Sequence, residues 1–284
     1  MIQEIAPYQY RNEYRPMPPE KHSILLCYEG RNILVKQKEG EISFLTFEEA
    51  EAYVDVTKLY QEYIYLFSSD DVRFYLGSHI SYDKIPEFEM EDTQILRTAR
   101  PKHLQFAGVT GWQLYRWYQS HRFCGRCGKP MVHDEKERMM RCPECGLMEF
   151  PKICPAVIIA VTHGNKILMS KYAGRAYKKY ALLAGFAEIG ETIEETVRRE
   201  VMEEVGLKVK NITYYKSQPW SFTDTLLMGF FCELDGEAEI TLDKEELALA
   251  EWFEREDIPV KAEDLSLTNE MMMVFKEGKI YKNP

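Results

Sequence analysis

One short segment carries the carboxylates that are best placed for chemistry. Residues 185–207 have the sequence GFAEIGETIEETVRREVMEEVGL. Glu200, Glu203 and Glu204 are spaced i, i+3 and i+4, so their carboxylates share one face of a helix that we predict from about residue 192 to Gly206. Like charges at this spacing repel, and oxygen ligands of this kind suit Mg²⁺ or Mn²⁺. The segment therefore predicts a site for a hard divalent cation.

Two glycines frame this helix. We expect Gly185 to let the chain turn sharply out of a strand over residues 180–184, and Gly206 to end the helix. The competing interpretation is an ordinary solvated helix with an acidic face, which is what most acidic runs are.

Four clustered cysteines form a second candidate metal site. Cys124 and Cys127 make one CxxC pair, and Cys142 and Cys145 make another after fourteen intervening residues. Each pair is followed directly by glycine. This pattern predicts a zinc ribbon with a closed, structural site of four thiolates. The alternative is four buried or redox cysteines, and we expect the nearby His133 to face solvent rather than the metal.

Composition narrows the class of protein. The 284 residues are 45% hydrophobic and 13% aromatic, enough for more than one core. A net charge of −10 argues against a broad electrostatic grip on DNA or membranes. Residues 1–16 lack the apolar segment of a signal peptide, and the apolar run 155–162 is too short to span a bilayer. Seven cysteines in an uneven arrangement suit a reducing compartment. We therefore expect a cytoplasmic protein with no membrane partner.

The pattern of elements predicts an α+β protein in four parts. Residues 1–95 form a β-rich N-terminal domain, 96–121 a connecting helix, 122–149 the zinc ribbon and 150–284 the domain that contains the acidic helix. Thr46 is expected to cap a short helix over 47–50, and a helix over 102–120 could be interrupted at Gly108 and Gly111. In the N-terminal part, strands are predicted at 23–28, 32–36, 42–44, 63–67 and 73–76.

The last part alternates strands with helices. A final helix is predicted at 267–277, so one helix lies on each side of a mixed sheet. This arrangement predicts an α/β/α sandwich. The predicted strands are 156–163, 166–171, 180–184, 209–215, 226–233 and 249–253.

The acidic segment also matches a known motif. Gly185, Glu191, the pair Arg199-Glu200, the pair Glu203-Glu204 and Gly206 stand in the order of the Nudix box, with apolar residues at the expected positions. The chain therefore resembles the Nudix hydrolases, which cleave a nucleoside diphosphate linked to another moiety. The resemblance implies a Nudix fold for residues 150–284.

Two further features resemble the NADH pyrophosphatase branch of that family. The zinc ribbon directly precedes the Nudix domain, and residues 217–225 have the sequence SQPWSFTDT. The branch carries SQPWPFPxS there, so the chain keeps the SQPW core and Phe222 but departs at Ser221, Thr223 and Thr225. The resemblance spans essentially the whole chain.

This resemblance implies metal-dependent hydrolysis of the NAD(H) pyrophosphate to AMP and nicotinamide mononucleotide. It extends to removal of NAD caps from RNA 5′ ends. It implies that Glu200, Glu203 and Glu204 bind Mg²⁺ or Mn²⁺ and are catalytic, with Arg199 orienting them. A distal glutamate completes the set: Glu246 matches the family context better than Glu245, and both stay open.

The resemblance also implies the residues that hold the dinucleotide. Phe186 and Trp220 would line the nucleotide pocket by stacking on a flat base, and Gln218 belongs to the same motif. Phe150 would reach the site of a partner subunit, because the family forms homodimers. We therefore expect a homodimer whose partners are NAD(H) or a related dinucleotide and NAD-capped RNA.

Three alternatives stay open at this stage. The departures in SQPWSFTDT keep open a different Nudix substrate, such as ADP-ribose or a diadenosine polyphosphate. A second alternative is a non-catalytic zinc-ribbon binding protein with a decayed Nudix domain. The intact set of Glu200, Glu203 and Glu204 argues against this alternative. A third is nucleic-acid binding by basic residues of the ribbon, which acidic neighbours offset; these basic residues are Arg122, Arg126, Lys129, Arg138 and Arg141.

Overall fold

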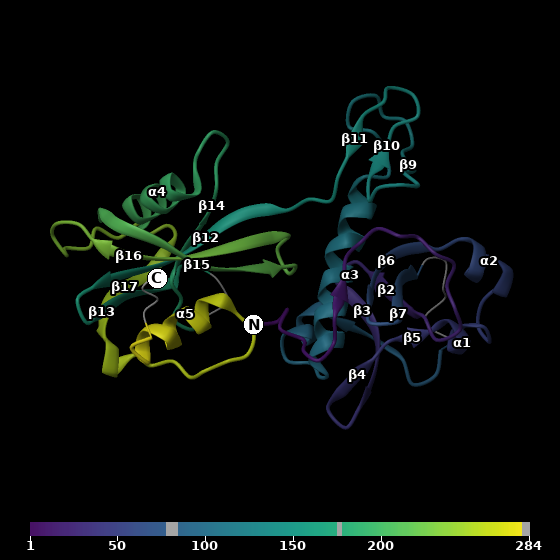
Figure 1. Ribbon diagram of the computed structural model, residues 1–284, viewed down its shortest axis with the longest axis horizontal. Helices are drawn as coiled ribbons and strands as arrows, with labels where there is room; N and C mark the ends of the chain where they lie inside the picture. The colour runs from purple at the N-terminus through teal and green to yellow at the C-terminus, as the bar shows by residue number, and fades with distance from the viewer. Residues whose placement is uncertain (78–84, 175–177, 280–284) are drawn as a thin grey trace. The chain divides into compact units, whose positions relative to one another are not determined.

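The computed structural model describes residues 1–77, 85–174 and 178–279 of the chain (Figure 1). The chain divides into two compact units. One unit comprises Ile153–Trp220 and Asp224–Pro284 together with Met1, and it contains the acidic helix. The other comprises Ile2–Lys152 and Ser221–Thr223. We call them the C-terminal unit and the N-terminal unit.

An eight-stranded sheet forms the body of the N-terminal unit. Its strand order is β1-β6-β7-β2-β3-β4, with β5 beside β2 and β8 beside β3. All five predicted strands are present within a few residues of their predicted bounds, and β1, β5 and β8 were not predicted. The bounds are β1 Tyr10–Arg11, β2 Ile24–Glu29, β3 Asn32–Lys38, β4 Glu41–Ser43, β5 Leu45–Thr46, β6 Ile64–Ser69, β7 Val72–Gly77 and β8 Glu89–Asp92.

Short helices connect these strands. The helix α1 (Phe47–Ala50) starts at Thr46, whose hydroxyl accepts from the Glu49 backbone N–H while the Glu49 carboxylate accepts from the Thr46 N–H. This reciprocal capping box confirms the predicted cap. Two other short elements were not predicted: α2 (Val56–Gln61) and the 3-10 helix η2 (Thr93–Arg97).

The predicted connecting helix is α3 (Lys102–Ser120), and it runs without interruption. The interruption considered at Gly108 and Gly111 does not occur. A Cβ on Gly108 would lie 2.9 Å from the Phe44 ring, and one on Gly111 would lie 2.4 Å from a methyl of Leu26. The two glycines therefore let the helix pack closely on the sheet. No helix in the described parts of the chain, α3 included, is long and apolar enough to cross a membrane.

The C-terminal unit is built on a six-stranded mixed sheet. Its order is β15-β16-β12-β13-β17, and β14 pairs with β12. Strand β14 starts three residues later than predicted, and β15 extends five residues further. The bounds are β12 Cys154–His163, β13 Lys166–Tyr172, β14 Leu183–Phe186, α4 Ile193–Val205, β15 Val209–Trp220, β16 Thr225–Leu234, β17 Leu247–Glu254, η3 Arg255–Asp257 and α5 Leu267–Lys276.

The helices α4 and α5 cover opposite faces of this sheet (Figure 1). Along β12, Val157 and Ile159 belong to the core that contains α4, whereas Ile158 and Ala160 belong to the core that contains α5. Alternation of this kind is what a strand buried on both faces requires. The predicted α+β class and the α/β/α sandwich of the C-terminal unit are confirmed.

Candidate metal and substrate site

The helix α4 has well-defined ends. Thr192 is its N-cap: the hydroxyl accepts from the Glu195 N–H, and the Glu195 carboxylate accepts from the Thr192 N–H at 2.8 Å. Gly206 ends the helix in the left-handed conformation, with φ of 69°. Both ends agree with the prediction, and together they fix which turn of the helix each glutamate occupies.

The predicted metal ligands on α4 differ in exposure. Val197, Val201 and Val205 pack into the core beneath the helix. Glu204 is 2% exposed and Glu200 is 8% exposed, while the side chain of Glu203 is 56% exposed. The acidic face therefore runs from the edge of the core out to solvent. This is not the exposure pattern of a fully solvated face.

Arg199 connects the glutamates of the segment. Its Nη1 donates to Glu200 Oε1 at 2.7 Å and to Glu203 Oε2 at 2.8 Å. Its Nε and Nη2 donate to the two oxygens of Glu191 at 2.5 and 3.0 Å. Nη2 also donates to the Phe186 carbonyl at 2.9 Å. A planar guanidinium can make such contacts simultaneously, so Arg199 orients the carboxylates as the resemblance implied.

Glu191 is a residue whose role the sequence did not reveal. Besides both contacts with Arg199, it accepts from the Glu188 N–H at 3.1 Å and from the Thr196 hydroxyl at 2.9 Å. The hydrogen bonds from Arg199 are the main reason that the pKa of Glu191 is lowered to about 2. Glu191 is thus a fixed anion that holds Arg199. The position of Glu191 in the Nudix box indicated that the residue has a role. The motif alone does not distinguish a carboxylate that holds Arg199 from one that binds a metal.

Gly185 serves a different purpose from the predicted one. It lies inside β14, paired with Val157, and not at a turn after the strand. A Cβ on Gly185 would lie 1.9 Å from Glu200 Cδ and 2.0 Å from Glu200 Oε1. The sharp-turn expectation is therefore wrong. The glycine is needed because the Glu200 carboxylate rests directly on the backbone of β14.

The charges around Glu200 indicate which distal glutamate is near. Burial raises the pKa of Glu200; hydrogen bonding and charge from Arg199 lower it, and the charges of Glu203 and Glu246 raise it further. The structure thus brings Glu246, which directly precedes β17, into electrostatic reach of α4. The carboxylate oxygens of the four predicted ligands are not gathered as tightly as the cysteine sulfurs described below. These ligands are Glu200, Glu203, Glu204 and Glu246.

Strand register shows where the aromatic residues lie. Phe186 pairs with Ala156, Ala156 pairs with Leu227, and Leu227 pairs with Gln218, so these four residues form one row across the sheet. Residues in one row share a face, and Leu227 packs in the core that contains α5. Phe186 is 54% exposed on that face.

Trp220 lies two residues beyond Gln218 in β15 and therefore on the same face. It is half-buried and pairs with Thr225, at the end of the sheet where Phe186 ends β14. The structure thus places the two predicted base-stacking residues on one face of the sheet, near one end. The Glu200 carboxylate rests on the other face, against Gly185.

Gln218 and Phe150 occupy different surroundings. Gln218 is fully buried; its Nε2 donates to the Leu265 carbonyl at 2.9 Å, and its Oε1 accepts from the Leu267 N–H at 2.7 Å. Phe150 follows the ribbon in the N-terminal unit and is 54% exposed. Phe222, from the same motif as Gln218, belongs to the N-terminal unit. The guanidinium of Arg97 lies 4.4 Å from the centre of the Phe222 ring.

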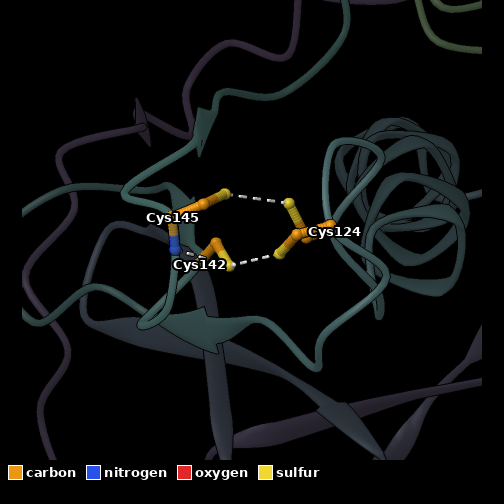
Figure 2. Close-up of side chains that lie close together, drawn as sticks. Cys124, Cys142 and Cys145 are labelled. Atoms are coloured by element: carbon orange, nitrogen blue, oxygen red, sulfur yellow. Dashed lines mark hydrogen bonds between the residues drawn. The ribbon is translucent and has the colours of Figure 1, made fainter.

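The four ribbon cysteines converge (Figure 2). Cys124 and Cys145 Sγ lie 3.5 Å apart, as do Cys127 and Cys142 Sγ. All four sulfurs lie within 4.8 Å of one another. A tetrahedral Zn–S₄ site has sulfur–sulfur distances of about 3.8 Å. Within residues 1–77, 85–174 and 178–279, this is the single group of three or more potential ligands gathered so closely.

Two matching turns hold these sulfurs. The Cys124 N–H donates to the Lys129 carbonyl, and the Cys142 N–H donates to the Leu147 carbonyl, each at 2.8 Å. Gly128 and Gly146, which follow the second cysteine of each pair, both have φ of 73°. The repeated geometry is that of two zinc knuckles. His133 is exposed and lies beside Tyr118, outside the sulfur cluster, as expected.

Comparison with protein families matches both parts of this description. Residues 152–272 match the NUDIX domain, and residues 119–150 match the NADH pyrophosphatase zinc ribbon domain. These matches confirm the resemblance inferred from the sequence motifs. They also agree with the closed cluster of four cysteines and with the capped helix that carries the glutamates.

Individual relatives carry names of one kind, and the chain also aligns with solved structures. A protein named NAD-capped RNA hydrolase NudC from Citrobacter koseri is 43% identical over 156 residues, 55% of this chain and 60% of that protein. One of the same name from Klebsiella pneumoniae is 41% identical over 160 residues, 56% of this chain and 62% of that protein. The chain thus matches about three fifths of the length of these relatives. A NUDIX hydrolase crystal structure from Nitrosomonas europaea aligns with TM-score 0.48 and 23% identity, covering 55% of this chain and 91% of that one.

Proposed function

We propose that this chain, in which a NADH pyrophosphatase zinc ribbon domain precedes a Nudix domain, is a metal-dependent pyrophosphohydrolase. Its substrate is NAD(H), which it cleaves to AMP and nicotinamide mononucleotide. The observation that carries the proposal is the contact set of Arg199. One side chain binds Glu200 and Glu203 and also the Phe186 carbonyl, so it links the acidic helix to the strand that ends in an aromatic residue.

The acidic residues fit a divalent cation. Glu200, Glu203, Glu204 and Glu246 would hold Mg²⁺ or Mn²⁺, since they supply carboxylate oxygens and little else. The neighbouring negative charges that raise the pKa of Glu200 are a repulsion that a cation relieves. When bound, such ions supply Lewis acidity toward the pyrophosphate and a water of lowered pKa.

The chain's own side chains position and recognise the substrate in this proposal. Arg199 holds the carboxylates of Glu200 and Glu203 on its Nη1, and Glu191 fixes Arg199 through Nε and Nη2. Phe186 and Trp220 stack on a flat base of the dinucleotide, on the sheet face opposite the Glu200 carboxylate. A substrate would thus pass around the end of β14, with its base on one face and its phosphates toward the other.

The same site accommodates a second form of the substrate. An NAD-capped RNA presents the same pyrophosphate and nicotinamide at its 5′ end, and two relatives at 41–43% identity are named NAD-capped RNA hydrolases. The net charge of −10 disfavours sequence-independent binding of the RNA body. We therefore propose recognition of the capped end alone.

Two further proposals concern the zinc ribbon and assembly. The zinc is structural, because all four ligands are cysteines of the chain and no coordination position is left for a substrate. The protein acts as a homodimer in which Phe150 reaches the partner's substrate site; the 54% exposure of this large apolar side chain supports that role. Light scattering during size-exclusion chromatography tests the dimer, and a monomeric mass at working concentration would contradict it.

Turnover on a panel of substrates tests the proposed function. NADH, NAD⁺, NAD-capped RNA, ADP-ribose and a diadenosine polyphosphate are compared at equal concentration with Mg²⁺ or Mn²⁺. The proposal predicts that nicotinamide-containing substrates are preferred. Preference for ADP-ribose or a diadenosine polyphosphate would favour the alternative that the departures at Ser221, Thr223 and Thr225 keep open. Inactivity on every Nudix substrate would favour a non-catalytic binding protein.

A further inference from the structure

Gln218 lies in the segment that resembles the substrate-specificity motif, but its side chain binds the protein's own backbone. It is fully buried, and its amide makes hydrogen bonds to Leu265 O and Leu267 N at 2.9 and 2.7 Å. The orientation of the amide is fixed, because a carbonyl can only accept and a backbone N–H can only donate. Rotating the amide by half a turn would lose both bonds.

These two contacts lie at the start of α5. Leu267 is the first residue of the helix, so its N–H has no partner within the helix. Ser266, the N-cap, accepts from the Asn269 N–H instead. Gln218 therefore completes the N-terminal cap of α5 from a neighbouring strand.

The segment that Gln218 binds is itself well anchored. Asn269 donates to the Lys261 carbonyl at 2.9 Å and accepts from the Glu263 N–H at 2.8 Å, which ties the preceding loop to α5. A Cβ on Gly229 would lie 2.7 Å from Met271 Sδ, so α5 rests directly on the backbone of β16. The start of α5 is thus a fixed reference point against which Gln218 holds β15.

Trp220 lies close to this attachment along the strand. It follows Gln218 by two residues, shares its face of the sheet and is the last residue of β15. Tyr215 and Lys216 also connect β15 to α5, through Glu270 at 2.7 and 2.6 Å, but they lie further from Trp220 along the strand. Among the contacts described here between β15 and the start of α5, those of Gln218 are nearest to Trp220.

We propose that Gln218 is a positioning residue that clamps the end of β15 to the start of α5 and thereby sets the place of Trp220. It does not contact the substrate. This differs from the direct contact expected from the motif. The consequence for substrate preference rests on the proposed function, whereas the clamp itself does not.

A double-mutant cycle with Gln218→Met and Trp220→Ala tests the proposal on the full chain. Gln218→Met keeps the length of the side chain and removes both hydrogen bonds. It should lower kcat/KM for NADH about tenfold or more, since small displacements of binding groups have effects of this size. Trp220→Ala should lower it about five- to two-hundred-fold. Because Gln218 acts through Trp220, the double variant should match Trp220→Ala alone.

Losses that multiply in the double variant would show that Gln218 acts on the substrate independently, and they would overturn the proposal. Unchanged kcat/KM in Gln218→Met would overturn it as well. Tyr215→Phe is the matched control, because it removes a different β15–α5 hydrogen bond and should leave the NADH kcat/KM near the wild-type value. If Gln218→Met does not fold, Gln218→Glu keeps the acceptor for Leu267 N–H and replaces it in the cycle, with the same non-multiplying result expected.

Hydrogen exchange separates the clamp from the enzymatic activity. The Leu267 amide should exchange faster in Gln218→Met than in the wild type, in protein without substrate. Unchanged exchange at Leu267 would refute the clamp. If the Leu267 amide exchanges faster in Gln218→Met but the wild type does not hydrolyse NADH, the clamp is supported and the proposed function is refuted.

Discussion

The backbone of Gly185 lies against the carboxylate of Glu200, so closely that a Cβ on Gly185 would lie 1.9 Å from Glu200 Cδ. The strand β14 and the helix α4 thus meet at the carboxylate that we propose as a metal ligand. The first glycine of the motif is explained by this contact between two elements.

Gly185→Ala is therefore expected to displace the Glu200 carboxylate. Activity with saturating Mg²⁺ should fall roughly a hundredfold, since a misplacement of about 1 Å can have that effect. Gly125→Ala, where a Cβ meets nothing within 4 Å, is the control and should keep full activity. Wild-type activity in Gly185→Ala, measured on folded protein, would mean that the position of Glu200 does not matter for the reaction.

Arg199→Lys should raise the Mg²⁺ concentration needed for half-maximal activity. A lysine ammonium cannot bind Glu191, Glu200, Glu203 and the Phe186 carbonyl together, as the guanidinium does. Loss of a residue that orients metal ligands typically lowers metal affinity or activity about 10- to 100-fold. A magnesium titration of activity measures the shift.

The neighbouring arginine provides the control for that substitution. Arg198 contacts only the Glu194 carbonyl of its own helix in the described hydrogen bonds, so Arg198→Lys should give the wild-type titration curve. If Arg198→Lys and Arg199→Lys raise the Mg²⁺ concentration for half-maximal activity equally, any arginine-to-lysine change on α4 has this effect. That result would contradict the orienting role of Arg199.

Glu246→Gln and Glu245→Gln form a matched pair that identifies the distal glutamate. Burial is the main reason that the pKa of Glu200 is raised, and the charge of Glu246 contributes to that rise, which favours Glu246 as the distal ligand. Glu246→Gln should reduce turnover at saturating Mg²⁺ by at least about tenfold, and Glu245→Gln should leave it nearly unchanged. The reverse order of effects would assign the ligand to Glu245.

Cys142→Ser should release zinc and lower the melting temperature. Binding energy at a four-cysteine site contributes directly to folding, so losing one ligand destabilises the ribbon. Elemental analysis of protein purified under reducing conditions, without chelator, should find about one zinc per wild-type chain. Cys154→Ser, outside the cluster, should retain it. Absence of zinc from the wild type would contradict the ribbon assignment.

Much of this architecture follows from local sequence patterns. The bounds of α3, the capping box at Thr46 and both ends of α4 were predicted because each depends on residues within one or two turns. The cysteine spacing likewise determines two knuckles before any tertiary contact is known. The row of side chains across β14, β12, β16 and β15 was not predictable, because strand register joins segments far apart in sequence.

The failures have one cause in common. Gly111 was considered as a point where a helix could be interrupted, and Gly185 was expected to make a turn, because a glycine's local effect is on backbone freedom. In the structure both glycines allow close packing, against Leu26 and Glu200 respectively. The backbone partners of Gln218, Leu265 and Leu267, were likewise not predictable, because they lie almost fifty residues further along the chain.

Identification of the products formed from NADH is the direct test of pyrophosphate hydrolysis by this chain. The protein is incubated with NADH and Mg²⁺ or Mn²⁺, and the mixture is separated by chromatography. Pyrophosphate hydrolysis should give AMP and reduced nicotinamide mononucleotide in equal amounts. Glu204→Gln, which keeps the shape of the side chain and loses its charge, should give neither product. Release of free nicotinamide, or equal product formation by Glu204→Gln, would contradict pyrophosphate hydrolysis at this site.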